Sequence, residues 1–202
     1  MNSMINQKKR NRPIAITPIA ILKVPCTHIF GFSPEQNRYI QEKHRQVLRS
    51  AARLNAKYKS NSMEVVLLIN THTWEEWVVE GKEERVVYMN DNLTANQAMD
   101  TSPKNSLMLL HNHPGTGTFS AEDIKTFCNT DSLYIITVVG NDGTIYLLKK
   151  ENNFDSEKLL LAYGNLAEKY SRYSNNATRA VAYILANASN YGLSYKKGRA
   201  KI

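Results

Sequence analysis

Apolar residues recur along this chain with two different spacings, and the change of spacing predicts where helices and strands lie. In residues 34–57 they recur every three to four positions, which is typical of an amphipathic helix, and Ser33 before Pro34 is typical of a helix start. Residues 63–70 and 106–110 are short apolar runs instead, as expected for buried strands. The first half of the chain therefore predicts a long helix followed by strands of one sheet.

The same two spacings continue to the C-terminus. Asn141, Asp142 and Gly143 form a strong hairpin signal between two apolar runs. We expect further strands over residues 84–89, 133–139 and 144–148. We expect further helices over residues 92–101, 121–129, 155–173 and 177–190. Together these elements predict an α/β fold in which a central mixed β-sheet is flanked by helices.

Composition limits the size and the setting of this fold. The chain has 202 residues, of which 42% are hydrophobic, and this favours one domain with appendages or at most two small domains. Cys26 and Cys128 are the two cysteines, so the sequence offers neither a disulfide framework nor a Cys-x-x-Cys metal pair. Free thiols and the lack of an export signal predict a cytoplasmic protein in a reducing compartment.

The N-terminal segment has the basic and apolar regions of an export signal but lacks a cleavage site. Basic residues 8–12 precede the apolar residues 14–22, but Pro13 and Pro18 interrupt the apolar run and no small-x-small cleavage site follows. We therefore expect residues 1–32 to form a basic extended arm that packs as an edge strand of the sheet. No apolar stretch is long enough to cross a membrane, so we expect no membrane partner.

Positive charge is concentrated at both ends of the chain. Residues 1–24 carry five Lys or Arg and no acid, and residues 169–202 carry seven and no acid. Since the whole chain carries +8 and the two ends together carry +12, residues 25–168 carry a net −4. Basic ends can bind nucleic acid, an anionic surface or an acidic protein, and they can also be solvated tails that improve solubility. The candidate nucleic-acid contacts are Lys196, Lys197, Arg199 and Lys201.

Two histidines and a carboxylate lie within thirteen positions, in an order that could hold one metal ion. His111 and His113 end a buried strand and, being two positions apart, point to the same side of an extended chain. Pro114 and two glycines then turn the chain, and Ser120 starts a helix whose first turn holds Asp123. Two neutral imidazoles, one carboxylate and an open fourth position are what a catalytic zinc site requires.

Each part of this motif also has a purely structural interpretation. Ser120 with Asp123 is a helix-start signature, in which the serine caps the helix and the acid favours the helix dipole. A His-x-His pair is often incidental, because histidines also serve as surface or hydrogen-bonded groups. The order of all the parts around one turn favours the metal site over these alternatives.

The motif resembles the signature of the JAB/MPN+ (JAMM) metallopeptidase family, and within that family most the RadC-like branch. That signature is His-x-His, seven residues and Ser-x-x-Asp, whereas six residues separate His113 from Ser120 here. The resemblance covers residues 62–150. It implies a JAB/MPN (cytidine-deaminase-like) fold over residues 33–150 with a leading helix, followed over residues 151–202 by a C-terminal helical extension with a basic tail.

The resemblance also assigns roles to individual residues. His111, His113 and Asp123 would hold Zn²⁺, with water as the fourth ligand. Glu64 leads into the first apolar run, 47 positions before His111, and would take a proton from the water and pass it to the leaving amine. Alternatively, Glu64 is a charged residue that merely opens a strand. Ser120 would donate a hydrogen bond to the oxyanion.

The reaction that this resemblance implies is hydrolysis of a peptide or isopeptide amide bond. The substrate would be a protein or peptide, such as a flexible tail or a ubiquitin-like conjugate. Two other functions stay open: a RadC-like nucleic-acid-binding module whose basic ends grip phosphates, and a catalytically inactive MPN scaffold. A scaffold would more often have lost one of the four residue types, so the presence of all four favours the enzyme.

Overall fold

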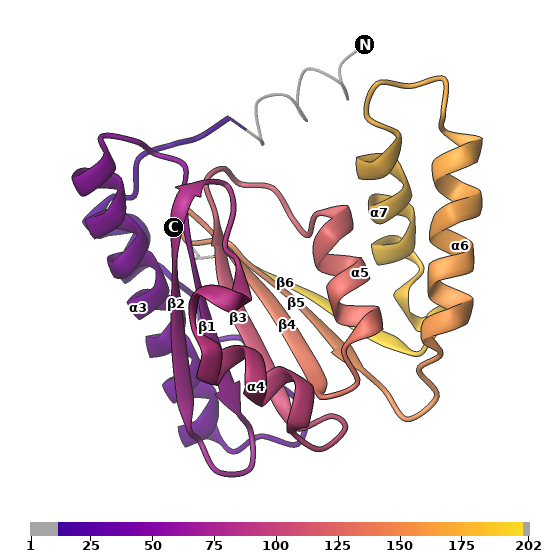
Figure 1. Cartoon of the computed structure of the whole chain (residues 1–202), viewed down its shortest axis with the longest axis horizontal. Helices are drawn as coiled ribbons and strands as arrows, with labels where there is room; N and C mark the ends of the chain where they lie inside the picture. Colours follow the sequence, from indigo (N-terminus) through magenta and orange to yellow (C-terminus); the bar gives the residue numbers. More distant parts are fainter. Residues whose placement is uncertain (1–11, 200–202) are drawn as a thin grey trace.

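Residues 12–199, which this computed structural model describes, are organised around a six-stranded mixed sheet (Figure 1). Its strands are β1 (Met63–Asn70), β2 (Glu76–Glu84), β3 (Leu107–His113), β4 (Leu133–Gly140), β5 (Ile145–Lys150) and β6 (Leu193–Gly198). Their order across the sheet is β2-β1-β3-β4-β5-β6. β3 and β4 run parallel, and the other neighbouring pairs are antiparallel.

Helices cover both faces of this sheet. They are α2 (Pro18–Leu22), α3 (Pro34–Tyr58), α4 (Leu93–Thr101), α5 (Ala121–Asn129), α6 (Ser156–Lys169) and α7 (Asn176–Ala186), with the short 3-10 helices η1 (Met89–Asp91) and η2 (Ala188–Tyr191). In Figure 1, α3 lies on one side of the sheet, and α5, α6 and α7 lie on the other. The expected α/β fold with a helix-flanked mixed sheet is therefore confirmed.

Side-chain alternation along β1 decides which residues meet which layer of helices. Val65 and Leu67 pack in the core that α3 covers, whereas Val66 and Leu68 pack in the core that α5, α6 and α7 cover. Successive side chains of a strand point to opposite faces. Glu64 therefore shares the face of the sheet on which α5 lies.

α3 is a 25-residue helix whose sequence explains both of its ends. Ser33 Oγ accepts a hydrogen bond from Gln36 N at 3.2 Å, and Gln36 Oε1 accepts one from Ser33 N at 2.7 Å, which is a reciprocal capping box. Pro34 follows at the first helical position, where its missing N–H costs nothing. Lys59 ends the helix in the left-handed region, with φ 53°. The helix predicted over residues 34–57 is confirmed.

The expected edge strand in the N-terminal arm is wrong for the described part of that arm, residues 12–32. This part contains the helix α2, which begins with a proline and which Thr17 caps by accepting a hydrogen bond from Ala20 N at 3.1 Å. A proline directly after an N-cap residue favours a helix start, so this segment forms a helix instead of the predicted edge strand. The arm joins the body of the protein at Ile14, whose N–H donates to Pro114 O at 2.9 Å.

The strand predicted over residues 84–89 is also wrong. β2 precedes most of this segment, and the chain turns at Arg85, where φ is 60°. Gly81 allows β2 to approach β1 closely, because a Cβ at this position would lie 2.8 Å from Glu64 O. The prediction failed because a glycine and several charged residues make β2 look like a turn in the sequence.

The C-terminal region adds a strand to the sheet as well as helices. α6 ends at Lys169 instead of continuing to residue 173. The segment expected to be a basic tail forms β6, which pairs with β5 from Leu193 opposite Lys150 to Gly198 opposite Ile145. Lysines are common on edge strands, where their charge discourages pairing with another sheet, so a basic segment can be a strand.

Cys26 and Cys128 are free thiols, so the described part of the chain has no disulfide bond. Among the helices of residues 12–199, we find none that is long and apolar enough to cross a membrane.

Candidate metal centre

The two motif histidines lie at the end of β3, in the middle of the sheet. In the register of the parallel pair, His111 lies opposite Val138 of β4 and His113 lies opposite Gly140. Leu109 precedes them on the same face and packs in the core below α5, α6 and α7. Alternation therefore directs both imidazoles to the α5 face, as the spacing of two predicts.

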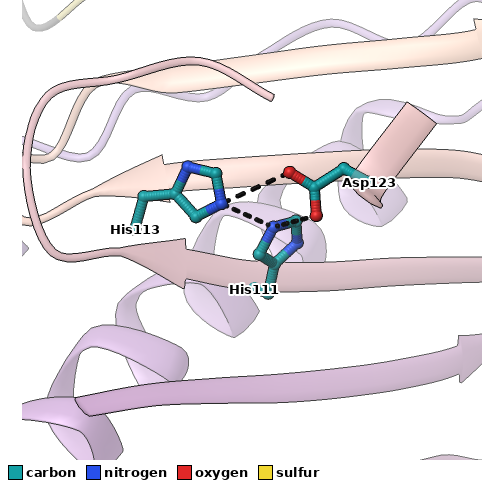
Figure 2. A group of neighbouring side chains, drawn as sticks. All are labelled: His111, His113 and Asp123. Carbon is teal, nitrogen blue, oxygen red and sulfur yellow. Dashed lines mark hydrogen bonds and ion pairs between the residues drawn. The ribbon is translucent and has the colours of Figure 1, made fainter. Parts of the chain in front are cut away.

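Asp123 reaches these histidines from the first turn of α5 (Figure 2). Ser120 caps this helix: its Oγ accepts a hydrogen bond from Asp123 N at 3.1 Å, and Ser120 N donates to Asp123 Oδ2 at 2.6 Å. The interpretation of this pair as a helix cap is therefore correct. It does not compete with metal binding, because Asp123 Oδ1 still lies 3.1 Å from His111 Nε2.

Three donor groups converge at this point. His111 Nε2 lies 3.1 Å from His113 Nε2 and 3.1 Å from Asp123 Oδ1, while His113 Nε2 lies 3.4 Å from Asp123 Oδ2. A tetrahedral site with metal–ligand bonds near 2.0 Å separates its ligand atoms by about 3.3 Å. The side chains are only 6%, 16% and 16% exposed, respectively. This group of buried donors could hold a metal ion.

The hydrogen bond of the His113 ring prepares it for metal binding. His113 Nδ1 lies 3.0 Å from Thr118 O, and a carbonyl can only accept, so Nδ1 carries the proton. In the neutral ring, Nε2 then presents its lone pair toward His111 and Asp123. A carbonyl partner of this kind orients many metal-binding histidines. The Nδ1 atom of His111 is buried and has no hydrogen-bond partner among the described residues.

The charges of the three groups act strongly on one another. Burial alone would raise the pKa of the Asp123 carboxyl, but the imidazoles of His111 and His113 hold that pKa well below its usual value. Burial also disfavours a charged His113 ring, yet its hydrogen bond with Asp123 raises the pKa of this histidine overall. Asp123 is therefore a carboxylate at neutral pH, which is the state that binds cations.

Glu64 lines the same cleft as the three donor groups. Burial raises the pKa of its carboxyl, although the nearby imidazoles of His113 and His111 favour the charged form. A buried carboxyl with a raised pKa, beside a group of residues that could hold a metal ion, is typical of residues that exchange protons during catalysis. The structure thus brings the predicted base to the same cleft as the predicted ligands.

Asn112, between the two histidines, holds the segment of β1 that carries Glu64. Asn112 Oδ1 accepts a hydrogen bond from Val65 N at 2.8 Å, and Asn112 Nδ2 donates to Met63 O at 3.1 Å. These backbone groups flank Glu64 on either side. Because Asn112 is fully buried, its amide fixes the backbone of Glu64 relative to β3 and its histidines.

The short loop after His113 is held in place by hydrogen bonds from β5 and from the turn before it. Tyr146 OH donates to Thr116 O at 2.9 Å, and Asn141 N donates to Gly115 O at 3.1 Å. These bonds pack the loop down onto the end of the sheet. The loop of six residues therefore still delivers the start of α5 to the histidines.

Ser120 uses its hydroxyl proton within the helix cap. Its Oγ donates to Asp123 Oδ2 at 2.8 Å while accepting from the Asp123 N–H. The family resemblance assigns this proton to an oxyanion, whereas in the structure the proton is donated to the carboxylate of Asp123. Ser120 therefore positions Asp123 here, and an oxyanion role requires the hydroxyl to change partner.

The site opens into a cleft of about 550 Å³. Part of its lining is apolar and comes from three neighbouring strands, through Val66, Leu109 and Ile136. The remaining lining includes Arg85 beside β2 and Thr178 of α7. A cleft of this size, apolar with a few polar groups at one place, is typical of sites that bind small molecules or chain segments.

The lysines and arginine considered for nucleic acid do not belong to this cleft. Lys196 and Lys197 are in β6: Lys196 Nζ donates to His28 O at 2.7 Å, and Lys197 Nζ lies 5.1 Å from the centre of the Tyr146 ring. Arg199 directly follows β6 and is exposed. The fourth residue of this set, Lys201, lies outside the described residues.

Three residues contribute to the site without having been predicted. The sequence does indicate a role for Asn112. Strand alternation places this polar side chain in the core, where it needs hydrogen-bond partners. Thr118 contributes through its carbonyl oxygen, for which the sequence carries no side-chain signal. Arg85 lines the cleft at a turn, where the sequence predicts a strand over residues 84–89.

Comparison with known proteins adds no family to this geometry, since no family model, no curated protein and no solved structure matches the chain.

Proposed function

We propose that this protein is a zinc-dependent hydrolase of the JAMM type, with a JAB/MPN fold, that cleaves peptide or isopeptide amide bonds. One observation carries the proposal: His111, His113 and Asp123 converge to distances of 3.1–3.4 Å, in a cleft that Glu64 also lines. The RadC-like resemblance of the motif supports the same reading.

The donor set suits zinc in a catalytic role. Two imidazoles and one carboxylate are a common protein ligand set for catalytic zinc, and they leave a fourth position for water or substrate. When bound, zinc supplies Lewis-acid chemistry, because it lowers the pKa of a water molecule and polarises a carbonyl group. The chain itself contributes the short distances between the donors and the fixed tautomer of His113.

Glu64 is the base of the proposed reaction. Its carboxylate takes the proton of the attacking water, and the resulting carboxylic acid gives a proton to the leaving amine. Burial raises its pKa, so the carboxyl holds that proton more readily than an exposed glutamate would. Asn112 keeps the backbone of Glu64 in place during both transfers.

The proposed substrate is an amide within a protein or peptide, for example in a flexible tail or a ubiquitin-like conjugate. The apolar lining next to the donor groups suits an apolar side chain close to the scissile bond. The nucleic-acid alternative draws on β6 and its neighbours, which do not line this cleft, and no described contact favours it. An inactive scaffold would not need Glu64 and Asn112 beside a complete donor set.

Metal analysis of the full-length protein, purified without chelator, tests the proposal. We expect about one zinc ion per chain. The double variant His111→Ala/His113→Ala should lose the metal, whereas His72→Ala, at an exposed histidine, should keep it. A wild-type protein without metal, or a double variant with as much metal as the wild type, would show that these residues do not form the site.

A further inference from the structure

Arg85 has a backbone conformation that a non-glycine residue rarely adopts. Its φ is 60°, in the left-handed region. Two backbone contacts hold the turn at Arg85. Arg85 N donates a hydrogen bond to Ser62 O at 2.8 Å, and Glu83 pairs with Val86 in an isolated antiparallel β-bridge. Residues kept in such conformations cluster at functional sites, so the placement of Arg85 needs an explanation.

The side chain of Arg85 is exposed and lines the cleft. Within residues 12–199, it makes no hydrogen bond and no ion pair, and it is the one Lys or Arg side chain among the residues that line the cleft. The charge of Arg85 acts on the carboxyl of Glu64, whose charged form it favours. Glu122, an exposed acid of the lining, is paired with Lys125 at 2.8 Å. Arg85 is therefore available to a ligand.

The position of Arg85 relative to Glu64 determines which part of a substrate Arg85 can contact. Ser62, which binds the backbone of Arg85, is two residues before Glu64 on the same segment. Under the proposed function, Glu64 protonates the leaving amine, so this amine lies beside Glu64. The leaving group is therefore the part of the substrate nearest to Arg85.

We propose that Arg85 binds a carboxylate carried by the leaving group, so that the enzyme prefers amides whose amine product is an amino acid with a free carboxylate. This inference rests on the proposed function. A guanidinium group binds a carboxylate through two parallel hydrogen bonds, which gives both strength and orientation. The carboxylate can be the C-terminal α-carboxylate or the side chain of an aspartate or glutamate, since both present the same group.

The reaction itself is ordinary hydrolysis, and Arg85 takes no part in bond making. The oxygen of water adds to the carbonyl carbon, the C–N bond breaks, and the proton that Glu64 took from water goes to the nitrogen. The products are a carboxylate and an amine that carries a second carboxylate. Arg85 holds this second carboxylate, so it determines specificity.

Three substrates that differ only in the leaving group test this assignment: N-acetyl-leucyl-glycine, N-acetyl-leucyl-glycinamide and N-acetyl-leucyl-aspartic acid diamide. The last two carry amides in place of every carboxylate. A fourth, N-acetyl-leucyl-aspartic acid α-amide, keeps only the side-chain carboxylate. We expect kcat/KM to be roughly 10-fold or more higher for the substrates with a carboxylate, in line with a charge-assisted hydrogen bond. The first and fourth substrates distinguish the two sources of the carboxylate.

Arg85→Gln should abolish this preference, so that the ratio of kcat/KM between carboxylate and neutral substrates falls to about one, and Arg85→Lys should restore part of that ratio. Lys82→Gln is the matched control, because Lys82 is an exposed cation of β2 that pairs with Asp91 at 2.7 Å and does not line the cleft. A wild-type preference that survives in Arg85→Gln would overturn the inference and leave the proposed hydrolase intact.

A binding measurement separates this inference from the proposed function. N-acetylglycine should shift the Nε–Hε NMR signal of Arg85, and N-acetylglycinamide should not. If the protein hydrolyses none of the substrates but shows this selective shift, the carboxylate site stands and the proposed hydrolysis fails. If neither compound shifts the signal, Arg85 is not a carboxylate site.

Discussion

Two histidines, His44 and His113, lie on opposite faces of the same sheet, and their pKa values are shifted in opposite directions. On the α3 face, His44 is 2% exposed and lies 2.8 Å from Thr137 Oγ1 of β4. Burial lowers its pKa to about 4. On the α5 face, His113 is also shielded from water, but the neighbouring Asp123 raises its pKa.

In this fold, burial alone makes a histidine a neutral packing residue. A hydroxyl partner, such as that of Thr137, leaves this outcome unchanged. A carboxylate partner reverses it, since it attracts either a proton or a metal ion to the ring. Asp123, rather than either motif histidine alone, therefore distinguishes the candidate metal centre from the core on the other side of the sheet.

The largest expected effect is on turnover, and it should be confined to the α5 face. If hydrolysis follows the proposed mechanism, Glu64→Gln should keep the metal and the fold but lower kcat by about 100-fold or more, because the base is lost. His44→Gln on the α3 face and Glu75→Gln on the surface should change kcat by less than about two-fold. Steady-state kinetics with zinc analysis on the same samples checks this, and full activity of Glu64→Gln would exclude Glu64 as the base.

A smaller effect should appear in the pH dependence of stability of the metal-free protein. The unfolded chain protonates His44 near pH 6.5 and the folded protein only near pH 4. The unfolded state thus binds more protons between these values, so stability falls by up to about 1.4 kcal/mol for each unit that the pH decreases. His44→Gln should remove this loss, as measured by urea unfolding between pH 4 and pH 7.

His113 should show the opposite sign in the same experiment. Its folded pKa lies above the unfolded value of 6.5, so its contribution to stability is complete below pH 6.5 and is lost as the pH rises through the folded pKa. His113→Gln should therefore flatten the neutral to alkaline side of the profile, whereas His44→Gln flattens the acid side. If the two variants change the profile in the same way, the contrast between the two faces is wrong.

The smallest effect concerns the basic strand β6. Substitution of Lys196, Lys197 and Arg199 by Gln should leave zinc content and kcat within about two-fold of the wild type, because these residues do not line the cleft. Substitution is a better test than deletion, since deletion would remove a strand that pairs with β5. If the nucleic-acid alternative holds, short DNA binds at about 100 mM salt and the triple variant shows a shallower salt dependence in fluorescence anisotropy.

The candidate metal centre was largely predictable because its signals are local. His111, His113 and Asp123 lie within thirteen positions, and the strand period and the helix cap together determine how they face one another. Glu64 lies far away in the sequence, and only the family resemblance connects it with the histidines. Asn112 indicates that a buried polar side chain needs partners, but no local pattern shows that these partners flank Glu64.

The errors in the fold arise where distant contacts prevail over local patterns. β6 is a strand because β5 offers it an open edge, although its lysines suggest a solvated tail. β2 tolerates its glycine and its charges because Gly81 packs closely against β1. The turn at Arg85 depends on a hydrogen bond to Ser62, and the pattern of neighbouring residues does not predict a contact between residues so far apart in the sequence.

The spread of these contacts along the sequence has a consequence for the order in which the protein matures. The metal donors need only one strand end and one helix start, so a partly folded chain can already collect an ion. The loop after His113 is also held from the N-terminal arm, because Ile14 N donates to Pro114 O at 2.9 Å. Ile14 O in turn accepts from Asn141 Nδ2 at 2.8 Å, 127 positions away, and such distant contacts form late. If the chain binds a metal as proposed, its metal content is therefore no measure of correct folding, and a metal-loaded population without the native loop is the expected by-product of incomplete refolding.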